Sequence, residues 1–334
     1  MNTEIIDILN NIKYNQKIKE SNLISFFTPT YNRAQFLGRL YEMLLNQSSH
    51  QFVWIIVNDG SKDNTDEIAK QFINDNKLPI LYIHKRNGGK HSAFKVALDK
   101  CQTQYFQCMD DDDIYSNDSV KIYMDAWNQI IKEGKKDIGA VRTIAKYKNT
   151  ERFVSDNPSL IANTKTEDLS TLEMNYIRKH HQENWTCYKT EALHKVDIFP
   201  KNYWMSDVHK FFAENIWQGR FARYYKCRYI YISVRDYTDD AEVSLTRSIK
   251  SRQHYLDMFI NEKMCLDEQY DYISLNYRDL IKRIIKLQLL RGYLNIPLDE
   301  LINHTERKKL KFLFNLTSII SIMGNKIIKH RSKR

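Results

Sequence analysis

The sequence is poor in the residues that interrupt or cross-link a chain. Its 334 residues include only 9 glycines and 5 prolines, which is too few for long disordered linkers. The five cysteines contain no Cys-x-x-Cys spacing, and one must stay unpaired. We therefore expect free thiols in a reducing compartment, and a chain built as one large domain or one domain with an appendage.

Long apolar runs are also missing. Phe312 to Met323 is an apolar stretch of twelve residues, whereas a helix that crosses a bilayer needs about 20. Residues 1–15 are polar and of mixed charge, so we expect a short N-terminal helix and no signal peptide. These features predict a cytoplasmic protein.

Acidic residues are missing from the C-terminal end of a chain whose net charge is +10. Residues 307–334 carry nine Lys or Arg and no Asp or Glu. Such a segment predicts peripheral contact with the anionic inner face of the cell membrane. The alternative is a core-facing helix with a solvated basic tail. We do not expect a nucleic-acid partner, because no recognition motif accompanies the charge.

Apolar strand-like runs alternate with helical patterns in the N-terminal third of the chain. This alternation is typical of an α/β domain with a mostly parallel sheet flanked by helices. From about residue 255 onward the pattern is helical. The predicted strands of the N-terminal third are Leu23–Phe27, Phe52–Val57, Ile80–His84 and Tyr105–Met109.

Polar motifs follow each of these four strands, where an α/β sheet binds its ligands. They are Thr28–Arg33, Asn58–Ser61, Asn87–Lys90 and Asp110–Asp113. Four adjacent carboxylates repel one another, and a divalent metal with a bound diphosphate would compensate them. Hard oxygen ligands suit Mn²⁺ or Mg²⁺. The alternative for the Asp run is a solvated acidic turn that caps the next helix.

The order of these motifs resembles the family 2 glycosyltransferases, which have the Rossmann-like GT-A fold and include enzymes of bacterial surface-polysaccharide synthesis. The resemblance is strong over residues 22–125 and weaker to about residue 247. It implies a metal-dependent, inverting hexosyl- or N-acetylhexosaminyltransferase. Such an enzyme moves a sugar from a nucleotide-sugar, here expected to be a UDP-sugar, to a hydroxyl of a glycan or lipid-linked saccharide.

The resemblance also implies a division of the chain. We expect an N-terminal helical extension (1–21), a GT-A domain (22–250) and a helical basic C-terminal region (251–334). The Gln-x-x-Arg-Trp motif of processive members is absent, as are their flanking membrane spans. A transferase that adds a single sugar is therefore the better interpretation.

The metal ligands implied by the resemblance are Asp110 and Asp112, with Asp110 acting through the metal or the ribose. Of Asp111 and Asp113, one is expected to face the donor sugar while the other caps the next helix. Asp59 occupies the position of the family's base-reading acid, which accepts the imide hydrogen of uracil. Its alternative role is to start the Asp59-Gly60 turn.

Pro29 and Tyr31 resemble the residues that frame the base, Tyr31 by stacking, although a plain turn is the alternative. Asn87 and Lys90 line the third loop, and Lys90 is expected to reach the diphosphate. Arg142, predicted to end a strand, and Arg247, after a polar loop, are candidate donor contacts. For both arginines a purely structural role is the alternative.

Glu214 is the candidate general base, and Asp207 is the second choice. The usual Glu-Asp pair of the family reads Glu214-Asn215 here, but a subgroup with a lone Glu resembles Glu214-Asn215-Ile216-Trp217. Two other functions stay open. One is a catalytically weakened sugar-nucleotide-binding protein at the membrane surface. The other is a nucleotidyltransferase of similar fold, although its glycine-rich basic signature after the first strand is missing.

Overall fold

The computed structural model of the chain describes residues 4–155, 166–180, 182–199, 202–237 and 251–322. The chain divides into two compact units. The first unit holds the sheet and comprises Met1–Met174, His180–Asp197 and Phe221–Glu242. The second unit is helical and comprises Asn175–Lys179, Ile198–Arg220 and Val243–Arg334.

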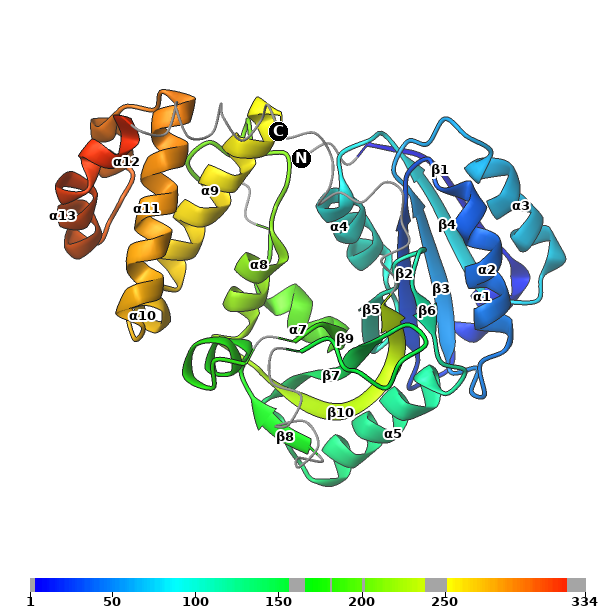
Figure 1. The fold of residues 1–334 in the computed structure, drawn as a ribbon. Coiled ribbons are helices and arrows are strands. Elements are labelled where there is room, and N and C mark those ends of the chain that lie inside the picture. Colours follow the sequence, from blue (N-terminus) through cyan, green and yellow to red (C-terminus); the bar gives the residue numbers. More distant parts are fainter. Residues whose placement is uncertain (1–3, 156–165, 181, 200–201, 238–250, 323–334) are drawn as a thin grey trace. The chain divides into compact units, whose positions relative to one another are not determined.

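One mixed sheet of ten strands runs through the first unit in the order β1-β4-β3-β2-β5-β9-β7-β10-β6, and β8 pairs with β10 (Figure 1). Strands β4, β3, β2 and β5 are mutually parallel, as the sequence pattern predicts. The strands are β1 (Ile5–Asn10), β2 (Ile24–Thr30), β3 (Phe52–Asn58), β4 (Ile80–Lys85), β5 (Tyr105–Cys108), β6 (Ile114–Tyr115), β7 (Ile138–Tyr147), β8 (Thr166–Leu169), β9 (Asn184–Lys189) and β10 (Lys226–Tyr237).

Helices of the first unit cover this sheet. They are α1 (Ile12–Lys17), α2 (Ala34–Leu45), α3 (Thr65–Asp75), α4 (Lys90–Lys100), α5 (Ser119–Lys132) and α7 (Thr190–Lys195).

The period of two along a strand explains the two covered faces. Phe26 points to the face that packs under α2, α3 and α5, where its ring meets those of Phe52 and Trp185. Its neighbour Phe27 points to the opposite face and meets Phe94 of α4. Both faces of β2 are therefore covered, as its nearly continuous burial shows.

The N-terminus is not the helical extension that we predicted. Residues Ile5–Asn10 form the edge strand β1, which pairs antiparallel with β4, and only Ile12–Lys17 is helical. Three β-branched isoleucines at positions 5, 6 and 8 favour a strand. The strand also covers an edge of β4 whose backbone groups would otherwise stay unpaired.

Helices form the second unit. These helices are α8 (Glu214–Phe221), α9 (Arg252–Glu268), α10 (Tyr270–Ile273), α11 (Tyr277–Leu294), α12 (Leu298–Asn303) and α13 (Lys308–Leu316). Two short segments, η1 (Glu173–Ile177) and η2 (Ser318–Ile320), complete the elements. Among the residues that the structure describes, no helix is both long and apolar enough to cross a membrane.

The two units follow boundaries different from the predicted ranges. The N-terminal residues belong to the first unit because β1 is part of its sheet. Residues 198–220 join the helical unit although they precede the predicted boundary at 250. One contact that ties this segment to the helices is a hydrogen bond of 3.0 Å, which the backbone amide of Ala213 donates to the Asn261 side chain of α9.

A buried arginine ties the far strands of the sheet to the end of α5. Arg228 of β10 donates two hydrogen bonds of 2.8 Å to Asp168 of β8 and one of 2.6 Å to Glu133. The hydrogen bond from Arg228 is the main reason why the pKa of Glu133 is lowered to about 2. This cluster therefore depends on both acids staying ionised.

We predict that Arg228→Met flattens the acid-side dependence of stability. The pKa of Glu133 is lower in the folded than in the unfolded chain, so its contribution is present above its ordinary value of 4.5 and is lost as the pH falls toward 2. Urea unfolding between about pH 5 and pH 2.5 should show a smaller fall in unfolding free energy for the variant than for the wild type. Arg278→Met, at an exposed position of α11, should keep the wild-type slope, and an equal slope in Arg228→Met would contradict the prediction.

Candidate active site

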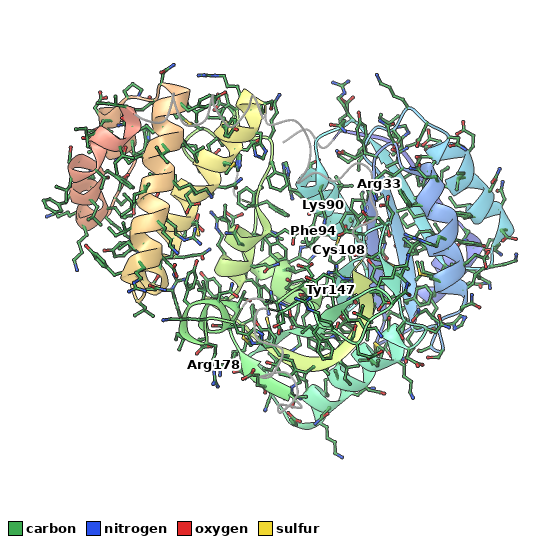
Figure 2. All side chains as sticks on the ribbon, in the orientation of Figure 1. Arg33, Lys90, Phe94, Cys108, Tyr147 and Arg178 are labelled. Carbon is green, nitrogen blue, oxygen red and sulfur yellow. The ribbon has the colours of Figure 1, made fainter. Side chains whose placement is uncertain are left out.

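The four polar motifs meet at one edge of the sheet. Strands β2, β3, β4 and β5 are parallel, so the loops that follow them lie at the same end. The backbone amide of Asp59 donates to the carbonyl of Thr30 at 2.9 Å, which joins the first two loops. Figure 2 marks Arg33, Lys90 and Cys108, which belong to this edge.

The four carboxylates after β5 alternate between exposed and buried positions. The side chains of Asp110 and Asp112 are 35% and 31% exposed. Those of Asp111 and Asp113 are only 4% and 9% exposed. The Asp run is therefore no uniformly solvated turn, because two carboxylates face solvent and two face the protein.

Arg33, which directly precedes α2, binds two of these carboxylates at once. Its Nε lies 2.8 Å from Asp111 Oδ1, and its Nη2 lies 2.7 Å from Asp112 Oδ2. Arg39 of α2 adds a hydrogen bond of 2.7 Å to the carbonyl of Asp112. The loop after β2 thus fixes the shape of the loop after β5.

Lys90, the first residue of α4, pairs with Asp110. Its Nζ lies 3.0 Å from Oδ1 and 3.1 Å from Oδ2 of that carboxylate. Burial alone would raise the pKa of Asp110, but the charge of Lys90, with Arg235 and Arg33 farther away, lowers it below the usual value. Asp110 is consequently an anion at neutral pH, as a metal ligand must be.

The pKa values of the two buried carboxylates shift in the opposite direction to that of Asp110. Burial raises the pKa of Asp111 to about 7 in spite of the opposing charge of Arg33. Burial likewise raises the pKa of Asp113 to about 6, although Arg235 of β10 lies 3.1 Å away. Asp113 and Arg235 form a structural pair between β10 and the Asp loop.

The Asp59 carboxylate is buried and organises the third loop. Its Oδ1 pairs with Nζ of Lys85, which is fully buried at the end of β4. The backbone amides of Gly88 and Gly89 donate to the same carboxylate at 3.0 and 2.7 Å. These contacts therefore hold the loops after β3 and β4 together. Recognition of a base by Asp59 stays a prediction.

Gly60 lets these two loops approach closely. Its φ is +80°, and a Cβ at this position would lie 2.9 Å from the backbone nitrogen of Asn87. Asn87 in turn donates to the carbonyl of Asp59 at 2.8 Å. A side chain at position 60 would force the loops apart, so the glycine is required by geometry.

The predicted base-framing residues lie at the end of β2. Pro29 is half-buried within the strand, and Tyr31 follows the strand with an exposed ring. An exposed aromatic ring beside a binding loop suits stacking on a planar base. Its contact with a nucleotide stays a prediction.

We predicted that Arg142 ends a strand, and the structure shows that it does not. It lies in the middle of β7, which continues to Tyr147, and its side chain is buried. Its Nη1 donates to the hydroxyl of Tyr229 at 3.3 Å, so it links neighbouring strands of the sheet. Contact with the donor stays a prediction. Arg247 lies outside the described residues.

Glu214 belongs to the helical unit, where it is the exposed first residue of α8. Asp207, the second candidate base, is exposed in a turn of the same unit. Both residues are exposed to solvent. The choice between them stays a prediction, and so does their approach to the donor.

The site offers part of a metal-binding shell. No three His, Cys, Asp or Glu side chains converge as a complete cage within the described residues. Mg²⁺ is usually held by only one or two carboxylates together with substrate phosphates. The half-exposed oxygens of Asp110 and Asp112 fit that arrangement, and Mn²⁺ accepts the same hard ligands.

Three cations of the site were missed as functional residues by sequence reasoning. They are Arg33, Lys85 and Arg235, which pair with Asp111, Asp59 and Asp113 in turn. The adjacent carboxylates signalled that counter-charges were needed, but not which residues supply them. A lysine within an apolar strand was the one local clue to Lys85, since lysine is rarely buried unless paired.

Comparisons with known proteins agree with this geometry. A family model described as "Glycosyl transferase family 2" matches residues 25–193. Over 201 residues the chain is 31% identical to a chondroitin synthase and to a hyaluronan synthase of Pasteurella multocida. Each alignment covers 57% of this chain and 19% of the relative, so the chain spans about a fifth of their length.

Solved structures share the fold. Residues 1–349 of S. aureus TarS in complex with UDP-GlcNAc superpose with a TM-score of 0.59 and 16% identity, covering 92% of each chain. The same region in complex with UDP gives 0.57 and 17%, covering 93% of this chain and 92% of that one. This likeness confirms the predicted GT-A fold class, with its mostly parallel sheet, flanking helices and helical C-terminal region.

We predict that Lys85→Met destabilises the first unit strongly. The substitution leaves the Asp59 carboxylate buried without its cation, which typically costs about 3–5 kcal/mol. Urea unfolding at neutral pH should show this loss of unfolding free energy. Lys121→Met, on the exposed face of α5, makes the same chemical change at the surface and should stay within roughly 0.5 kcal/mol of wild type. A fully stable Lys85→Met protein would show that the pair does not hold the loops.

Proposed function

This chain belongs to glycosyl transferase family 2, and from that premise we propose that it transfers a sugar from a UDP-sugar to a saccharide hydroxyl. The observation that carries the proposal is the alternation of the Asp run. Asp110 and Asp112 are half-exposed at the carboxyl edge of the parallel strands. That is where a nucleotide diphosphate binds in folds of this class.

The donor side of the proposed reaction lies in the first unit. Tyr31 and Pro29 would frame the base, and Asp59 would accept its imide hydrogen while keeping its pair with Lys85. Support for uridine as the base comes from the fold shared with TarS, which binds UDP-GlcNAc. Asn87, Arg142 and Arg247 remain proposed donor contacts.

The diphosphate leaving group would be neutralised from two directions. Asp110 and Asp112 would hold Mn²⁺ or Mg²⁺, which supplies Lewis-acid stabilisation of the departing phosphate oxygens when bound. Lys90 begins α4, whose N-terminal amides favour anions. Its ammonium group pairs with Asp110, and we propose that it contacts a phosphate of the donor. Asp111 would contact the donor sugar.

We predict that Asp112→Asn removes the metal dependence of UDP binding. Titration calorimetry of the wild-type chain should show UDP binding in Mn²⁺ that is lost in EDTA, because Asp110 and Asp112 would hold the metal ion that neutralises the diphosphate. The variant should bind UDP weakly and equally in both buffers.

Asp99→Asn is the matched control for this experiment. Asp99 is an exposed acid near the far end of α4, where it pairs with Lys95. The substitution removes the same charge at a position away from the Asp110–Asp113 loop, so the variant should keep the wild-type response to Mn²⁺. Equal UDP affinity of the wild-type chain in Mn²⁺ and EDTA would contradict the proposed metal role.

The acceptor must lose a proton as it attacks the donor sugar, and Glu214 is the proposed base. A carboxylate at an exposed helix start can accept that proton directly from a bound hydroxyl. Direct displacement by the acceptor would invert the anomeric configuration. Retention in the product would overturn this scheme.

We predict that Glu214→Gln keeps donor binding but slows transfer by about 10²-fold or more, the usual scale for a positioned base. UDP affinity is measured by calorimetry, and turnover by release of UDP. Hydrolysis of the donor can serve as the assay before an acceptor is known. Asp207→Asn is the comparison: near-normal turnover of Glu214→Gln with a slow Asp207→Asn would move the role to Asp207.

The acceptor is proposed to be a glycan or a lipid-linked saccharide in surface polysaccharide synthesis, such as a capsule. Support comes from the two Pasteurella relatives, which are synthases of polysaccharides by name. We propose a cytoplasmic enzyme with peripheral contact to the inner face of the membrane, where a lipid-linked acceptor would be presented. We propose no nucleic-acid partner, because no recognition motif accompanies the positive charge.

A binding protein with a weakened site is the second candidate. The observation that favours it is Asn215, which stands where the family's usual pattern has an Asp. Its backbone carbonyl accepts a hydrogen bond of 2.9 Å from Gln269, so this position also has a structural role. Metal-dependent UDP binding without any donor turnover would select this function over transfer.

A further inference from the structure

The end of the helical unit exposes an apolar stripe. In α13 the side chains of Leu310 and Phe314 are fully buried. On the other side, the stripe consists of four large apolar residues at helical spacing. Phe312, Leu316, Ile319 and Ile322 are 66%, 67%, 71% and 71% exposed. Phe312 and Leu316 lie one turn apart on the same face of α13, and Ile319 of η2 and Ile322 just after it continue the exposed apolar side chains along the chain.

The stripe is held by firm contacts below it. Gln288 of α11 donates to the carbonyl of Phe314 at 2.7 Å, and Arg291 donates to that of Ser318 at 3.3 Å. A Cβ at Gly292 would lie 1.8 Å from the carbonyl oxygen of Ser321, so the backbones meet directly. The segment that carries the exposed apolar residues is therefore packed firmly against α11.

Positive charge accompanies the stripe. Arg307, Lys308 and Lys309 are exposed at the start of α13. Lys308 lies one helical turn before Phe312 and so on the same face. The chain has no acidic residue from position 307 to its end. An occupant of this surface must combine apolar groups with negative charge.

We infer that the stripe docks on the surface of an anionic lipid bilayer. An interfacial helix inserts one apolar face to the depth of the headgroup boundary while its basic residues meet anionic lipids. A second copy of the chain is a poor occupant, because it would bring the same positive charges to the same surface. The inference specifies the membrane contact of the proposed function but does not depend on sugar transfer.

Vesicle flotation of the full chain, without donor, tests this inference. Vesicles of phosphatidylcholine with about one third phosphatidylglycerol should bind the protein, and vesicles of phosphatidylcholine alone should not. A double variant, Phe312→Ser with Ile319→Ser, should weaken binding by at least about tenfold through loss of inserted apolar area. Lys308→Gln with Lys309→Gln should weaken it on the order of twentyfold, and added salt should do the same to the wild type.

Matched controls exist in the same unit. Leu275→Ser changes another apolar residue that is 64% exposed, and Lys282→Gln removes an exposed lysine of α11. Both should keep wild-type binding. The inference is overturned if the double serine variant binds like the wild type, or if binding ignores lipid charge. It also fails if the chain is a dimer that the serine substitutions dissociate, because the stripe would then bind protein. UDP calorimetry on the same variants tests the donor site separately.

Discussion

Compensation of buried negative charge is the constraint on which the donor side of this protein depends. Asp59, Asp111 and Asp113 are buried, and each has a cation from another segment: Lys85, Arg33 and Arg235. A buried carboxylate without a partner would cost several kcal/mol. Each ion pair therefore fixes the distance between two segments: two pairs join the ends of β2 and β5 with β10, and the third joins the ends of β3 and β4.

Charge compensation is less complete at the two carboxylates that are proposed to take part in binding. Asp110 and Asp112 share their cations with solvent, since Lys90 and Arg33 are themselves 31% and 26% exposed. A half-exposed ion pair exchanges partners at small cost, whereas a buried one does not. The buried pairs thus support the two partly exposed carboxylates that are proposed to hold the metal ion.

The residues proposed to take part in the reaction come from both units of the chain. The family match, residues 25–193, lies almost entirely in the first unit, and so do the predicted donor contacts that the structure describes. The candidate base and the apolar stripe belong to the helical unit, largely outside that match. The family match therefore bears on the donor contacts, whereas the candidate base and the proposed membrane contact rest on residues outside it.

Local patterns in the sequence determined the strands β2 to β5, the helices between them and the edge where four polar motifs meet. Each of these signals spans a few neighbouring residues, so periodicity and turn chemistry were enough to predict them. Tertiary structure alone decided which carboxylates are buried, because the partners of Asp59 and Asp113 lie 26 and 122 positions away. It also made residues 5–10 an edge strand and placed Arg142 inside β7, since strand pairing is a non-local interaction that a single sequence does not reveal.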